Sequence, residues 1–144
     1  MTTTNCAGGV DCCDAPLTLL PGGPEGVAVL AKFFRALGDP ARLRLLEFLL
    51  AGERSVSECI RHIGLAQSRV SSHLACLADC GYVQFRREGR FSYYRVTDPR
   101  VAEVVHLARA LAADNAAALA ACMRIDARAP TESRPTEPAA TGSS

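Results

Sequence analysis

The chain has 144 residues, of which 49% are apolar and 22% charged, and its formal net charge is +1. This length fits one compact domain with tails, and no stretch approaches the roughly 18 uninterrupted apolar residues of a membrane span. The first residues lack the basic and then apolar order of a signal peptide, so we expect a cytoplasmic protein with no membrane partner. Seven cysteines, an odd number, then indicate reduced thiols for metal binding or redox sensing rather than a disulfide framework.

Charge is distributed unevenly along the chain. Residues 54–95 carry seven arginines against three acidic residues, whereas residues 1–25 carry three acidic residues and no basic one. A basic centre in a nearly neutral chain is typical of a localised nucleic-acid surface. A solvated charged face would give the same count of charges. The choice between this face and a nucleic-acid surface therefore depends on the motifs.

The first half of the sequence predicts an arm followed by two helices. Residues 1–23 are rich in Gly, Pro and Cys and predict a flexible arm that holds Cys6, Cys12 and Cys13. From Pro24 apolar residues recur at intervals of three and four, which indicates a helix that ends near Gly38. Asp39 followed by proline is typical of a helix start, so a second helix is expected to about residue 51.

A helix, a tight turn and a second helix follow. Ser55 can cap a short helix over residues 56–63, with a glutamate three residues on at the capping-box position. Gly64 ends that helix, residues 65–67 form the turn, and a further helix is expected from about Ser68 to Cys80. Gly81 then fits the position just beyond a helix C-terminus.

Two alternating runs over residues 82–87 and 91–96, joined around a glycine, predict a β-hairpin wing. A last helix is expected over residues 98–122, and its alanine-rich apolar face, with that of the first helix, predicts a homodimer. Residues 124–144 are rich in Pro, Thr, Ser and Ala and predict a disordered tail. The expected fold is therefore a mainly α winged helix-turn-helix over residues 24–123 with a small β-hairpin.

The helix-turn-helix carries a polar set that is suited to reading DNA. In this motif the second helix enters the major groove, with its first residues at base edges and flanking groups on phosphates. Arg69 can bind guanine through two hydrogen bonds and Gln67 can read adenine, whereas serines suit phosphates. The candidate DNA-binding residues are Gln67, Ser68, Arg69, Ser71, Ser72 and His73 on the helix and Arg86, Arg87 and Arg90 on the wing.

The same helix carries two cysteines four residues apart, Cys76 and Cys80. Residues at this spacing lie on one face of a helix, so two thiolates there can hold one soft metal ion. At about 100° per residue, this face is distinct from the core stripe. The core stripe comprises Val70, Leu74 and Leu77, and the neighbouring stripe comprises Arg69, His73, Cys76 and Cys80.

In combination, three motifs resemble the ArsR/SmtB family of metal-sensing winged-helix repressors, over about residues 30–96. They are Phe34-Arg-Ala-Leu-Gly-Asp-Pro-Ala-Arg-Leu-Arg-Leu-Leu46, Ser68-Arg-Val-Ser-Ser-His-Leu74 and Glu88-Gly-Arg-Phe-Ser-Tyr-Tyr-Arg95. The resemblance implies a homodimer that represses an operator without metal and leaves it when metal binds. It implies no enzymatic activity.

Metal sites in this family differ in position. The third-helix site is not matched, because Ser55-Val56-Ser57 stands where cysteines are usual, and His106 on the last helix lacks its partner ligands. The pattern around Cys76 and Cys80 resembles the CmtR-type cadmium and lead sensors, which implies Cys122 as a third ligand. Three thiolates favour Cd(II) or Pb(II), with Hg(II) or As(III) as further candidates.

Several alternatives stay open at this point. Cys12 and Cys13, with Cys6, can add a donor to the metal site. The Cys12-Cys13 arm also resembles that of arsenite-sensing relatives, which implies an arsenite-responsive repressor as an alternative. A redox-sensing repressor would instead oxidise Cys12 and Cys13, or Cys76 and Cys80, to a disulfide. A thiol-dependent enzyme would need His73 as a base beside Cys76, but His73 is better placed for DNA. Cys59 is expected in the core.

Overall fold

The computed structural model describes residues 17–126, and the chain divides into two units, residues 1–99 and 100–144. Cys6, Cys12 and Cys13 lie outside the described residues, as do most of the predicted arm and tail. Within the described part, no helix has the length and apolar character needed to cross a membrane.

The first two helices begin where the sequence predicts. Helix α1 covers Pro24–Leu37 and helix α2 covers Pro40–Leu50, each with proline in its first turn. The carboxylate of Asp39 accepts hydrogen bonds from the backbone N–H groups of Ala41 at 2.9 Å and Arg42 at 3.1 Å. This side chain satisfies two of the N–H groups that a helix start leaves without partners, so it fixes the start of α2.

The helix-turn-helix is confirmed. Helix α3 covers Val56–Ile63 and helix α4 covers Gln67–Asp79, one residue earlier at both ends than expected. Ser55 and Glu58 form the predicted capping box at the start of α3. Gly64 ends α3 with φ +75°, a left-handed conformation that glycine adopts without strain.

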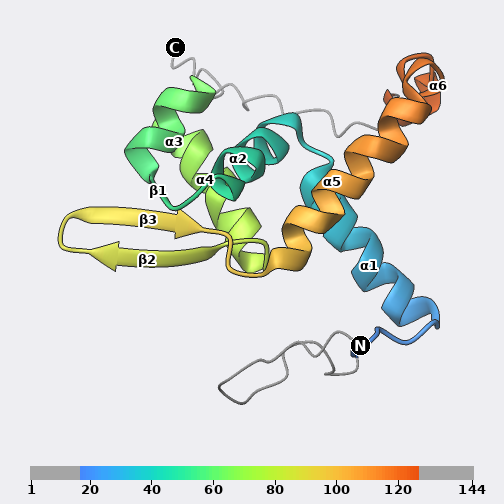
Figure 1. The fold of residues 1–144 in the computed structure, drawn as a ribbon, viewed down its shortest axis with the longest axis horizontal. Coiled ribbons are helices and arrows are strands. Elements are labelled where there is room, and N and C mark those ends of the chain that lie inside the picture. The colour runs from blue at the N-terminus through green and yellow to red at the C-terminus, as the bar shows by residue number, and fades with distance from the viewer. Residues whose placement is uncertain (1–16, 127–144) are drawn as a thin grey trace, which may run out of the picture. The chain divides into compact units, whose positions relative to one another are not determined.

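The wing forms part of a three-stranded antiparallel sheet with the order β1-β3-β2. Strands β2 (Gln84–Glu88) and β3 (Phe91–Arg95) make the predicted hairpin, which projects from the helices of its unit in Figure 1. Strand β1 (Arg54–Ser55) pairs with β3 and was not predicted. Two residues are too short to show the alternation that marks a strand in a sequence.

The core of the first unit lies among α2, α3 and α4. Its fully buried members include Leu45, Leu46, Leu49, Cys59, Val70, Leu74, Leu77 and Tyr82. The predicted core stripe of α4 is thus confirmed, and so is the core position of Cys59. Burial raises the pKa of the Cys59 thiol to about 11, so this cysteine is protonated and inert at neutral pH.

The last predicted helix is interrupted. Helix α5 covers Pro99–Asp114, and the short helices α6 (Ala116–Ala120) and α7 (Met123–Asp126) follow. The prediction of one helix to residue 122 is therefore wrong. The Asn115 side-chain amide donates to the Leu111 carbonyl at 2.9 Å, and such side-chain bonding to the backbone competes with helix continuation. Helix α7 also extends three residues into the predicted tail.

Candidate nucleic-acid interface and thiol pair

The N-terminus of α4 differs from that of α3 in a way that suits an anionic ligand. No side chain caps α4 at Ala66, whereas the capping box closes the start of α3. Backbone N–H groups in an uncapped first turn point out of the helix and attract phosphate, helped by the helix dipole. Gln67 and Ser68 in this first turn are both exposed, so the start of α4 is open to a nucleic-acid backbone.

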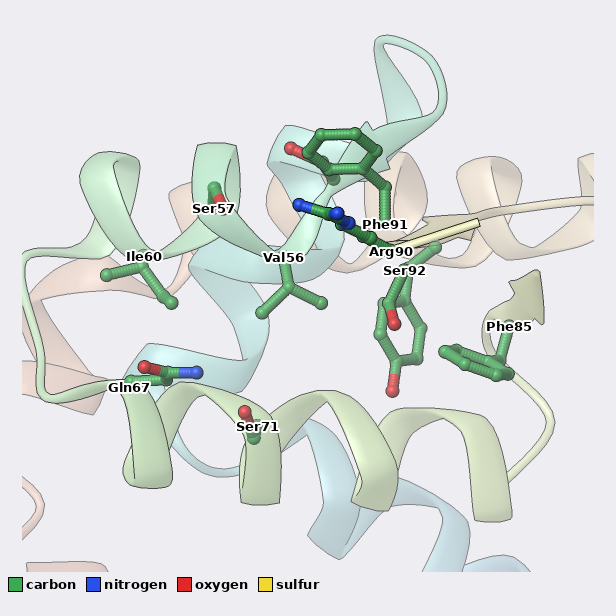
Figure 2. Close-up of a pocket in the computed structure, with 11 residues that line it drawn as sticks. Val56, Ser57, Ile60, Gln67, Ser71, Phe85, Arg90, Phe91 and Ser92 are labelled. Carbon is green, nitrogen blue, oxygen red and sulfur yellow. The ribbon is translucent and has the colours of Figure 1, made fainter. Parts of the chain in front are cut away.

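A polar groove runs between α3, α4 and the wing (Figure 2). It has a volume of about 360 Å³ and brings together side chains from three elements that are separate in the sequence. Gln67 and Ser71 line it from α4, and Arg90 lines it from the turn between β2 and β3. The groove therefore joins the predicted reading helix to the predicted wing contact on one surface.

The other predicted α4 residues line a second hollow of about 210 Å³, formed by Ser68, Arg69, Ser72 and His73. All are exposed except His73, which is half-buried. The Ser72 hydroxyl donates to the Ser68 carbonyl at 2.9 Å, so its proton is already used within the helix. Of the two serines, Ser68 is thus the better hydrogen-bond donor to a phosphate.

The three wing arginines are not equivalent. The Arg86 guanidinium contacts the Glu53 carboxylate at 2.6 Å and the Glu88 carboxylate at 2.5 Å, and it lies 4.7 Å from the centre of the Tyr93 ring. These carboxylates raise the pKa of Arg86 and neutralise its charge locally. The Arg87 side chain donates to the Gly89 carbonyl at 3.4 Å, and Arg90 lines the groove.

The thiols of Cys76 and Cys80 adjoin at the end of α4. The Cys80 backbone N–H donates to the Cys76 carbonyl at 3.0 Å, so the last helical turn is intact although Cys80 itself is the C-cap residue. Both side chains are half-buried and neither forms a disulfide. The predicted pair is therefore a two-sulfur site at the helix end that faces away from the DNA-reading end.

Burial raises the pKa of the Cys80 thiol, and the neighbouring Cys76, through its charge and a hydrogen bond, raises it further. Asp79 acts in the same direction, whereas Arg42 on α2 opposes it. Cys80 is consequently a protonated thiol at neutral pH, and a metal ion has to displace that proton.

Within the first unit, the described thiols of this site are the pair Cys76 and Cys80. Among residues 17–126, no three His, Cys, Asp or Glu side chains lie together as a metal cluster. Cys122 belongs to the second unit, between α6 and α7, and is half-buried there. Its role as a ligand stays a prediction, as do the roles of Cys6, Cys12 and Cys13.

Three residues that this surface depends on were not predicted from the sequence. Glu53 pairs with Arg86, the positive charge of Arg42 on α2 acts on the Cys80 thiol, and Tyr82 is buried two residues beyond Cys80. Each acts through a contact between segments far apart in the chain. Only Tyr82 carried a hint, since an aromatic residue directly after a helix-ending glycine often packs back on that helix.

Comparison with known proteins places this surface in a family. A family model described as "Bacterial regulatory protein, arsR family" matches residues 39–84, which contain the helix-turn-helix. A probable mercury resistance operon repressor of Streptomyces lividans is 63% identical over 95 residues, which are 66% of this chain and 76% of that protein. The chain belongs to the ArsR family.

Two further similarities agree with this ArsR-family membership. The transcriptional regulator CmtR of Mycobacterium tuberculosis is 44% identical over 84 residues, which are 58% of this chain and 66% of that protein. A homodimeric winged helix-turn-helix DNA-binding domain from Mycobacterium bovis superposes with a TM-score of 0.56 at 32% identity, covering 62% of this chain and 82% of that domain. The winged helix-turn-helix prediction is confirmed, and this ArsR-family protein is a transcriptional regulator rather than an enzyme.

The salt dependence of DNA binding should separate the wing arginines. Each phosphate contact that is lost lowers the slope of log affinity against log salt concentration by about 0.9. We expect Arg87→Ala and Arg90→Ala each to reduce the slope by about 0.9, the value for one phosphate contact. Arg86→Ala should leave the slope unchanged, because its charge is already matched by Glu53 and Glu88. Fluorescence anisotropy with a labelled duplex at several salt concentrations measures this, and a reduced slope for Arg86→Ala would show that Arg86 contacts phosphate.

Proposed function

We propose that this protein is a transcriptional repressor that binds operator DNA as a homodimer and leaves it when a soft metal ion binds Cys76 and Cys80. The observation that carries the proposal is the adjoining, half-buried thiol pair at the end of the DNA-reading helix. A ligand held there acts on the same rigid helix that presents Gln67 and Arg69 to DNA. A movement of the thiol pair therefore also moves the DNA-reading residues, because both belong to α4.

We propose Hg(II) as the first candidate effector, ahead of the Cd(II) and Pb(II) that the sequence favours. Thiolates select soft ions, and Hg(II) is satisfied by two of them. The described thiols form a pair, and the relative with 63% identity is named for mercury resistance. Cd(II) and Pb(II) would need a further donor, for which Cys122, Cys6, Cys12 and Cys13 are the candidates.

Exposed apolar side chains on α1 support the homodimer. Val27, Leu30 and Phe34 are large apolar residues of this helix that lie open to solvent in the single chain. Exposed apolar residues gathered on one element mark an interaction surface, and the similar Mycobacterium bovis domain is homodimeric. A dimer would place two α4 helices about 34 Å apart, one turn of DNA.

A redox-sensing repressor is less well supported by the same thiols. Disulfide formation begins with attack by a thiolate, and sensor cysteines have lowered pKa values and good exposure. The pKa of Cys80 is instead raised, and both thiols are half-buried. A metal ion overcomes this obstacle, because it displaces the proton as it binds.

Titration with metals tests the proposed function. The operator duplex is selected from a random-sequence library with the metal-free protein, and Hg(II), Cd(II), Pb(II) and As(III) are then added to the complex in turn. We expect DNA release together with a sulfur-to-metal charge-transfer absorption. Release by As(III) alone would favour an arsenite-responsive repressor, and release by peroxide without metal would favour redox sensing.

Metal affinity is expected to fall as the pH is lowered. The pKa of Cys80 lies above the ordinary thiol value of 9.0, so its thiol is protonated throughout pH 6–8 in the free protein. Each proton displaced by the metal makes the apparent affinity about tenfold weaker per pH unit of acidification. Competition titrations with a chelator of known pH dependence measure this slope. In Cys80→Ser, the slope should decrease by one proton, and an unchanged slope would show that Cys80 is not a ligand.

A further inference from the structure

The end of α4 is a rigid turn that links Cys80 to Tyr82. Gly81 has φ +83°, the Gly81 N–H donates to the Ala78 carbonyl at 3.0 Å, and the Tyr82 N–H donates to the Leu77 carbonyl at 2.9 Å. These two bonds form the Schellman motif, which satisfies the last carbonyls of the helix. A displacement of Cys80 is therefore passed to Tyr82 through a short, fully bonded backbone.

Tyr82 connects this turn to α1. Its side chain is 1% exposed, and its hydroxyl donates to the Phe33 carbonyl at 2.9 Å. The two rings are stacked, with centroids 4.4 Å apart and planes 25° apart. Phe33 in turn meets Phe34 edge-to-face at 5.8 Å, and Phe34 is 55% exposed on the apolar surface of α1. A continuous line of contacts runs from the thiol pair to that surface.

Arg42 provides a second connection to the same helix end. Its Nε donates to the Ala36 carbonyl at 2.5 Å, and a terminal guanidinium nitrogen reaches the Arg35 carbonyl at 3.4 Å. These are carbonyls of the last turn of α1, where a helix leaves C=O groups without i+4 partners, and the Arg35 carbonyl also accepts from the Gly38 N–H at 3.1 Å. The same guanidinium is the positive charge that acts on Cys80. The C-terminal part of α1 is thus held by hydrogen bonds from both Tyr82 and Arg42.

We propose that Tyr82 is a positioning residue that couples the thiol pair to α1, with Arg42 as a second tie. This rests on the proposed function, in which metal binds Cys76 and Cys80 and α1 contributes to the dimer. Metal binding shifts Cys80, and this shift changes the packing of Tyr82 against Phe33. The resulting movement of α1 alters the dimer and thereby the spacing of the two α4 helices. Coupling of this kind is a difference in metal affinity between two arrangements of the same contacts.

The Tyr82→Phe variant tests the connection, because it keeps the stacked ring and removes only the bond to the Phe33 carbonyl. We expect the operator affinity ratio without and with Hg(II) to fall by about 3–10-fold, the factor that one hydrogen bond supplies. The charge-transfer absorption should keep its intensity and metal stoichiometry. Tyr93→Phe is the matched control, since it removes a hydroxyl from the wing and should leave the ratio unchanged.

Fluorescence gives a direct readout of α1. The chain has no tryptophan, so Phe34→Trp introduces a single reporter on the exposed surface of α1. Addition of Hg(II) to the DNA-free protein should change its emission, and this change should be lost when Tyr82→Phe is added. Should Tyr82→Phe fail to fold, Arg42→Lys is the second variant, since it keeps the charge but cannot hold both carbonyls.

The outcomes separate the two proposals. A normal charge-transfer absorption with an unchanged affinity ratio in both Tyr82→Phe and Arg42→Lys would overturn the coupling role and leave the proposed function intact. No charge-transfer absorption in the unmodified protein would overturn the metal site and the coupling together. Loss of coupling with normal metal binding would support Tyr82 as the positioning residue.

Discussion

Replacing Cys76 with serine is expected to leave operator binding by the metal-free protein intact and to abolish its release by Hg(II). Cys76 is one of only two sulfurs in the described thiol pair, and a hydroxyl is a poor ligand for a soft ion. The residue is half-buried and lies outside the fully buried stripe of α4, so the fold should tolerate the change. In the unmodified protein, Hg(II) should weaken operator affinity by about 5–150-fold, and in Cys76→Ser this effect of Hg(II) should be absent.

Anisotropy titrations of Cys76→Ser and Cys80→Ser against the selected duplex, with and without Hg(II), measure this effect. Cys122→Ser is the informative companion variant. If two thiolates suffice, it keeps the release by Hg(II), whereas a three-thiolate site for Cd(II) or Pb(II) loses its response. Full release by metal in Cys76→Ser would contradict the assignment of the thiol pair.

Much of the fold was predictable because its boundaries are set by local chemistry. Asp39 and Ser55 cap the helices that follow them, and Gly64 and Gly81 adopt left-handed conformations where α3 and α4 end. Each signal depends on residues within one or two turns, so the sequence shows it directly. The thiol pair was predictable for the same reason, since a spacing of four places both side chains on one helical face.

The parts that were not predicted depend on distant contacts. The hydrogen bond from Tyr82 to Phe33 joins positions 49 residues apart, and the ion pair of Arg86 with Glu53 spans 33 residues. Arg86 was predicted as a DNA contact from its arginine-rich wing alone, and nothing nearby in the sequence indicates the Glu53 carboxylate. A pairing of this kind is set by the tertiary structure and has no local periodicity.

Separate faces of α4 hold the helix in place and carry its chemistry, and Leu74→Ala should demonstrate this. Leu74 is fully buried between the equally buried Val70 and Leu77. Truncating such a leucine leaves a cavity and costs about 2–5 kcal/mol, a large share of the roughly 5–15 kcal/mol that stabilises a domain. Urea unfolding should show this loss.

Its exposed neighbour provides the control, since Ala75→Ser should change the free energy of unfolding by less than about 0.5 kcal/mol. At temperatures where Leu74→Ala stays folded, it should still give the charge-transfer absorption with Hg(II), because the thiols lie on the adjacent stripe. Cys76→Ser should show the reverse pattern, with stability kept and absorption lost. A loss below about 1 kcal/mol in Leu74→Ala would contradict the packing of α4. The opposite responses of the two variants would show that the stability of α4 and its metal binding depend on separate stripes of the same helix.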